Sequence, residues 1–127
     1  MEVKLADYQV QTKTGDVHNG GTNANVFITF HGSDGASGPY ELDTPGENNF
    51  EQGDLDAFTL HVDNAGALES IDIQMDDTGT ASGWYLQWVR VTDPSNTQFC
   101  FPYGGWMGGG DGPTQVNLKP SDSGDCN

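Results

Sequence analysis

The sequence predicts an all-β sandwich, and three observations carry that prediction. No stretch of a dozen residues repeats its apolar positions with helical periodicity. Glycine is frequent, with 18 residues, and single glycines together with Asp-Gly, Asn-Gly and Gly-Gly pairs interrupt the chain about every 8–12 residues. Between these interruptions apolar and polar residues alternate, as expected of strands that bury one face.

The alternation predicts seven strands and one short edge strand. Alternate residues of a strand point to the same side, so each segment has a recognisable inward face. The segment 84–92 is the most apolar and is therefore expected at the centre of a sheet. In chain order the segments are 7–14 (Tyr8, Val10 and Thr12 on one face), 25–31 (Val26, Ile28, Phe30), 39–42 (the edge strand), 57–62 (Phe58, Leu60, Val62), 69–75 (Ile71, Ile73, Met75), 84–92, 98–102 and 115–118.

Two sheets of such strands, packed apolar face to face, enclose one hydrophobic core. A chain of 127 residues fits one domain, so residues 1–127 are expected to fold as a single unit. The glycine-rich residues 104–112 are expected to form a loop. The predicted core contains Val26, Ile28, Phe58, Leu60, Ile71, Ile73, Leu86 and Val89.

The charge is strongly negative, with 19 Asp+Glu against 4 Lys+Arg and a formal net charge of −15. Such a surface repels phosphate, so DNA and RNA are not expected partners. It attracts basic partners and divalent cations. The acidity is explained either by a solvated surface suited to a salty habitat or by calcium ligands among the aspartates, and both can hold together. No apolar run approaches the roughly 18–20 residues that a membrane span needs. The protein is expected to be a monomer.

The two cysteines, Cys100 and Cys126, allow either one disulfide or two buried thiols. Cys100 lies in an apolar run and is expected in the core. Cys126 lies in a polar tail that has no other reason to be ordered, which favours the disulfide. A disulfide in a small domain indicates a secreted, extracellular protein.

Three polar loops, residues 14–25, 41–53 and 76–80, carry the oxygen atoms that calcium prefers. Calcium takes about six to eight oxygen ligands, including backbone carbonyls that glycines allow to turn inward. A polar turn closed by side-chain hydrogen bonds is the competing interpretation, and composition alone favours it for the first loop. None of the three has EF-hand spacing.

Catalytic patterns are weak in this sequence. His18, His31 and His61 are far apart, and neither a nucleophile elbow nor a phosphate-binding loop occurs. Residue type alone does not exclude a glycosidase-like carboxylate pair. A small sandwich without long insertions rarely encloses the cleft that such a pair needs, so the protein is predicted not to be an enzyme.

A longer series of motifs resembles the PLAT domain, the lipoxygenase-homology module of polycystins, lipoxygenases, pancreatic-type lipases and clostridial alpha-toxins. The resemblance covers about residues 6–108, and residues 109–127 would form the last strand and a tail. The motifs that carry it are Tyr8-x-Val10-x-Thr12-x-Thr14-Gly15-Asp16, Gly21-Thr22-Asn23-Ala24-Asn25-Val26-Phe27-Ile28, Gly32, Asp54-x-Asp56-x-Phe58-x-Leu60, Gly66-x-Leu68-x-x-Ile71-x-Ile73, Gly79, Trp84-Tyr85-Leu86-x-x-Val89-x-Val91, Phe101-Pro102 and Trp106-Met107.

The resemblance implies an eight-stranded antiparallel β-sandwich that docks to proteins or membranes without catalysing a reaction. It also implies a calcium site in the loops at one end. Only one family carboxylate, Asp43, is clearly retained, so weak binding is expected, with a dissociation constant of ~10⁻⁴–10⁻³ M. The ligands that the resemblance implies are Asn19 in place of a carboxylate, Gly21, Thr22, Asp43, Thr44, Gly46, Asn49 (or Asn48) and Asp76 (or Asp77).

Docking members of the family carry exposed aromatic residues near that end. Tyr40, Trp106 and Met107 are the candidates for membrane or ligand contact here, although the family suggests that this tryptophan packs against the sandwich. Protein docking is preferred over lipid docking because an acidic surface is repelled by anionic lipid. The alternative is a calcium-stabilised carbohydrate-binding module. Its aromatic platform would consist of Tyr40, Tyr85, Trp88, Tyr103 and Trp106.

Overall fold

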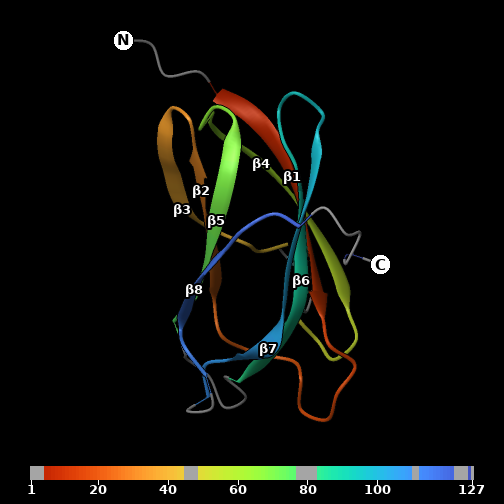
Figure 1. Ribbon diagram of the computed structural model, residues 1–127. Helices are drawn as coiled ribbons and strands as arrows, with labels where there is room; N and C mark the ends of the chain where they lie inside the picture. Colours follow the sequence, from red (N-terminus) through yellow and green to blue (C-terminus); the bar gives the residue numbers. More distant parts are fainter. Residues whose placement is uncertain (1–4, 45–48, 77–82, 110–111, 122–125, 127) are drawn as a thin grey trace.

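The computed structural model describes residues 5–44, 49–76, 83–109, 112–121 and 126, which form two four-stranded antiparallel sheets (Figure 1). The first sheet has the order β4-β1-β6-β7 and the second β3-β2-β5-β8. The predicted all-β sandwich is confirmed. No helix long and apolar enough to cross a bilayer occurs in these residues. The strands are β1 (Leu5–Thr14), β2 (Val26–Gly32), β3 (Gly35–Glu41), β4 (Leu55–Asp63), β5 (Leu68–Met75), β6 (Trp84–Thr92), β7 (Gln98–Met107) and β8 (Gln115–Leu118).

The core lies between the sheets and follows the predicted alternation. Seven of the eight predicted core residues are at most 6% exposed, and the exception is Leu60, which is half-buried. Leu60 belongs to β4, an edge strand with a neighbour on one side only, so the opposing sheet covers it incompletely. The strand β6 lies inside its sheet between β1 and β7, as its apolar composition predicts.

Two of the polar side chains inside the sandwich, Trp84 and Tyr8, have hydrogen-bond partners in the core. The indole N–H of Trp84 donates to the hydroxyl of Thr14 over 2.9 Å, and both side chains are fully buried. The hydroxyl of Tyr8 accepts a hydrogen bond from the amide of Ala65 over 3.0 Å. These bonds offset the cost of removing the indole and phenol groups from water.

The edge strand β3 begins at Gly35, earlier than the predicted start at residue 39. Its first residues pair with the end of β2, where Gly32 lies opposite Gly35. Glycine and serine are weak strand formers, so composition hides this part of the strand. The predicted edge position is confirmed, because β3 lies at the margin of the second sheet.

The strand β7 is also longer than predicted, and residues 104–107 are not part of a loop. They pair with the start of β6, where Tyr85 lies opposite Trp106 and Trp84 opposite Met107. Gly105 pairs with Leu86, and the register shifts between Leu86 and Trp88. Gly104 lies at this irregularity and adopts a φ of 67°, which favours glycine. Pairing with a long neighbouring strand outweighs the low strand propensity of glycine here.

The disulfide between Cys100 and Cys126 is present, with Cα atoms 5.7 Å apart, and this prediction is confirmed. Arg90 of β6 reinforces it by donating from Nη1 to the carbonyl of Cys126 over 3.0 Å. Cys126 is thereby held against the first sheet beside β6 and β7.

The connections gather at the two ends of the sandwich (Figure 1). One end carries residues 15–25, 42–44, 49–54 and 108–109. The other end carries the turn at 33–34 and the connections at 64–67 and 93–97. Each end contains a cavity lined by described residues.

Candidate functional site

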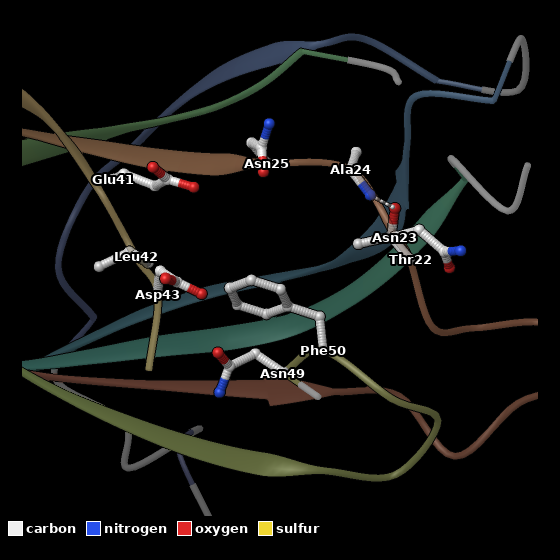
Figure 2. Close-up of a pocket in the computed structure, with 9 residues that line it drawn as sticks. All are labelled: Thr22, Asn23, Ala24, Asn25, Glu41, Leu42, Asp43, Asn49 and Phe50. Atoms are coloured by element: carbon white, nitrogen blue, oxygen red, sulfur yellow. Dashed lines mark hydrogen bonds between the residues drawn. The ribbon is translucent and has the colours of Figure 1, made fainter. Parts of the chain in front are cut away.

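A polar pocket of about 210 Å³ opens at the end that carries residues 15–25, 42–44 and 49–54. Its walls come from the segment before β2, the segment after β3 and the segment before β4 (Figure 2). We call it the loop-end pocket. Its lining residues are Thr22, Asn23, Ala24, Asn25, Glu41, Leu42, Asp43, Asn49 and Phe50.

Two carboxylates enter the loop-end pocket from one extended segment. Leu42 is 2% exposed, and its amide donates to the carbonyl of Val26 over 2.8 Å, which fixes the segment against β2. Because the side chains alternate, burying Leu42 leaves Glu41 and Asp43 together on the other side. Their carboxyl groups point toward the same space between Asn25 and Phe50 (Figure 2). Two like charges so placed favour the binding of a cation between them.

Phe50 joins the two longer loops that form the pocket. Its amide donates to Asp56 over 2.8 Å, and its carbonyl accepts from the amide of Thr22 over 2.9 Å. The residue has a φ of 62°, which is uncommon for an aromatic residue, while its ring is buried and packs edge-on against Trp84 at 5.1 Å. The surrounding contacts hold this conformation, so the pocket floor is continuous with the core.

Asn49 is a structural element of the loop as well as a lining residue. Its amide oxygen accepts from the backbone of Thr44 over 2.9 Å, and its amide nitrogen donates to Asp56 over 3.1 Å. Asp56 is 9% exposed and receives hydrogen bonds from both Asn49 and Phe50. A buried carboxylate with two donors is satisfied, so Asp56 positions the pocket without facing its opening.

Asp76 reaches the same region through Asn25. Its carboxylate accepts from the Asn25 backbone amide over 3.0 Å and from the Asn25 side-chain amide over 2.7 Å. The end of β5 thus brings a third acid next to a residue that lines the pocket. This charge adds to the local negative potential of Glu41 and Asp43.

The predicted ligands are brought together only in part. Thr22, Asp43 and Asn49 line the loop-end pocket. The other described predicted ligands do not line it, namely Asn19, Gly21, Thr44 and Asp76. Gly21 serves a close approach instead, because a Cβ atom there would lie 2.8 Å from the carbonyl oxygen of Phe50. Gly46 lies outside the described residues. The alternatives Asn48 and Asp77 also lie outside them.

Sequence reasoning missed Glu41, Asn23 and Asn25 as lining residues. For Glu41 a signal existed, because an acid two positions before Asp43 shares its face when the intervening leucine is buried. In the part of the chain that the structure describes, no group of three or more His, Cys, Asp or Glu side chains could hold a metal ion. A cation in this pocket would therefore need amide, hydroxyl and backbone oxygens in addition to the carboxylates.

The predicted contact residues differ in their access to solvent. Met107 is fully buried, so the prediction that it contacts a membrane or ligand is wrong, and the reason is that β7 continues through it into the core. Trp106 is half-buried and meets the ring of Tyr85 edge-on at 5.3 Å. Tyr40 is half-buried too, and its hydroxyl is 2.7 Å from that of Ser37.

The five aromatic residues expected as a carbohydrate platform do not form one surface. Trp88 is 2% exposed and lies beneath the guanidinium of Arg90, whose Cζ is 4.9 Å from the ring centroid. Tyr40 belongs to the second sheet, and the other four belong to the first. The hydroxyl of Tyr103 donates to the backbone carbonyl of Trp106, 3.3 Å away.

Two histidine–aspartate pairs lie on the sheets away from the loop-end pocket. His31 and Asp72 are 2.7 Å apart, and Asn117 donates to the same carboxylate over 2.9 Å. Burial opposes ionisation of Asp72, but the hydrogen bonds from His31 and Asn117 outweigh it and lower the pKa of this carboxyl below its ordinary value. The second pair, His61 and Asp7, is exposed. Neither pair includes a residue that lines the pocket.

Comparison with known proteins gives consistent matches over most of the chain. Residues 8–118 match the PLAT/LH2 domain family. Human lipoxygenase homology domain-containing protein 1 is 37% identical over 114 residues, which are 88% of this chain and 6% of that protein. Human polycystin-1-like protein 3 is 38% identical over 87 residues, which are 68% of this chain and 5% of that protein.

A solved structure shares the arrangement of strands. Coral 8R-lipoxygenase, described as activated by calcium through a C2-like domain, matches with a TM-score of 0.83 and 25% identity. The match covers 91% of this chain and 17% of the lipoxygenase. In all three comparisons the chain therefore spans a small fraction of a much longer protein.

Proposed function

Because the chain belongs to the PLAT/LH2 domain family, as its motifs predict, we propose that it is a non-catalytic, calcium-binding module that docks to a protein or membrane surface. The observation that carries the proposal is the pair of carboxylates, Glu41 and Asp43, directed into one polar pocket at the loop end. The calcium activation described for the coral lipoxygenase supports the choice of metal. The disulfide supports an extracellular location.

The proposed ligands are those that the loop-end pocket supplies. Asp43 and Glu41 provide the charge, and Thr22, Asn25 and Asn49 provide neutral oxygens. Calcium accepts such a mixed and irregular oxygen set, whereas magnesium requires near-ideal octahedral geometry. With two lining carboxylates and several neutral oxygens, we expect a dissociation constant of ~10⁻⁴–10⁻³ M, which is typical of extracellular modules.

Calcium is expected to stabilise the fold by binding the native state alone. At ten times the dissociation constant the gain is about 1.4 kcal/mol, which raises the melting temperature by about 5 °C. Asp43→Ala should remove most of this rise, and magnesium should produce a smaller one. Thermal melting in chelator, calcium and magnesium measures these effects.

The matched control is Asp63→Ala, which removes an exposed aspartate from the end of β4 and should retain the calcium response. A melting temperature unmoved by about 10 mM calcium, which exceeds the expected dissociation constant, would rule out the metal site without affecting the fold.

Docking is proposed to depend on calcium because the free protein is too acidic to approach an anionic surface. A net charge of −15 is repelled by anionic lipid, and a cation bound between Glu41 and Asp43 reduces that repulsion locally. The predicted aromatic contact residues Tyr40 and Trp106 are half-buried, and stable membrane attachment normally needs two signals. These features favour protein docking as the main role.

Flotation with neutral and anionic liposomes tests this preference. We expect no flotation in chelator and weak flotation with anionic liposomes in calcium. Strong flotation in chelator contradicts the charge argument. Lipid docking would be established instead if the wild type floated in calcium, Trp106→Ala did not, and the control Phe99→Ala still did.

A further inference from the structure

The end of the sandwich opposite the loop-end pocket contains a second cavity, of about 530 Å³. The β4–β5 and β6–β7 connections lie at this same end (Figure 1). Residues of both connections line the cavity, and Leu68 of β5 and Phe99 of β7 add a residue from each sheet. Leu68, Phe99, Ala67 and Pro94 give it apolar walls, and Asn64 and Asp93 lie at its polar margin. We call it the Leu68 cavity. Its size falls within the range of about 300–1,000 Å³ that is usual for ligand sites.

Hydrogen bonds within the two connections hold the walls of the Leu68 cavity in place. One carboxylate oxygen of Asp93 accepts from the backbone amides of Ser95 and Thr97, over 3.0 and 2.9 Å, and from the hydroxyl of Ser95 over 2.7 Å. On the other side, the side chain of Asn64 accepts from the amide of Gly66 over 2.9 Å. A cavity formed in advance loses little conformational entropy when it is occupied.

One acidic residue lines the cavity, and two more are next to lining residues. Asp93 lines it, and Asp63 directly precedes the lining residue Asn64. The side chain of Asp34, in the turn between β2 and β3, lies next to Gly66 of the β4–β5 connection. No lysine or arginine is among the described residues that line the cavity. An apolar depression with this margin attracts a group that is apolar in its body and positively charged at its edge.

The same charge argues against two other occupants. A second copy of this chain also carries −15, and like charges would oppose their association. An anionic membrane surface is repelled for the same reason. A basic peptide with an apolar side chain meets both requirements of the cavity.

We propose that the Leu68 cavity binds a peptide segment of a partner protein in which a large apolar side chain is flanked by lysine or arginine. The apolar side chain occupies the space over Leu68 and Phe99, and the flanking cations face the acidic margin. This site is separate from the proposed calcium site, and its occupation does not require calcium.

The test uses isotope-labelled protein and three short peptides, followed by amide chemical shifts. One peptide places leucine and phenylalanine between arginines, a second replaces the arginines with glutamates, and a third replaces the apolar residues with alanines. Only the first should shift the amides of residues 64–68, 93 and 95–99. Its affinity should be equal in calcium and in chelator, and should fall as salt concentration rises.

Two matched variants locate the site. Ala67→Arg places a cation in the wall of the Leu68 cavity and should weaken the first peptide about tenfold or more. Ala57→Arg makes the same chemical change on an exposed position of β4 outside the cavity and should leave the affinity unchanged.

Several results would overturn the proposal. The first peptide could leave the amide chemical shifts unchanged, or the glutamate peptide could change them equally. The shift changes could be confined to the loop-end pocket. The two arginine variants could also weaken the affinity for the first peptide equally. None of these would bear on calcium binding, which is measured at Asp43.

Discussion

Shortening Leu86 or Ile73 to alanine is expected to lower the free energy of unfolding by about 2–5 kcal/mol. Both side chains are fully buried, and they lie on β6 and β5, so each loses apolar burial and leaves a cavity in the packed core. Close packing of the interior prevents complete collapse around the missing atoms. Urea denaturation of the two variants and the wild type measures the difference.

Leu55→Ala provides the control for these variants. Leu55 begins β4 and is 53% exposed, so the same truncation should change stability by at most about 0.5 kcal/mol. A loss below about 1 kcal/mol at both Leu86 and Ile73 would contradict the orientation of the strands.

Removing the disulfide is expected to be comparably costly. Cys100 and Cys126 are separated by 26 positions, and the chain-entropy model gives about 3–4 kcal/mol for a loop of this length. The hydrogen bond from Arg90 to the carbonyl of Cys126 depends on the same attachment and should be lost with it. Denaturation with and without reductant measures the loss.

A variant with both cysteines replaced by serine serves as the control, because its stability should not respond to reductant. Intact-mass analysis after alkylation of the native protein gives an independent check. Two alkylatable thiols there would show that the bridge is absent.

The candidate site could be predicted only in part. Asp43, Thr22 and Asn49 were expected as ligands and line one pocket. Asp56, which holds Asn49 and Phe50 in place, was not identified, because an aspartate in a strand normally faces solvent. Its burial depends on two donors from a loop six and seven positions earlier, and strand alternation contains no information about such donors.

The sequence by itself determined most residues of the core, with Leu60 as the exception among those predicted. Alternation is a local property of each strand, and a shift by one residue would expose every apolar side chain of a strand such as β2. The family could be identified for a similar reason, since its motifs record this alternation together with the turns between strands.

Only the tertiary structure decided where strands end and which loop residues meet. Trp106 and Met107 follow a glycine pair and have no local reason to be extended, but pairing with β6 extends β7 through them and buries Met107. Glu41 and Asn25 are 16 positions apart in the chain and line one pocket because β2 and β3 are neighbours. Contacts between distant segments are made only when the sheets pack, so neither result follows from a local pattern.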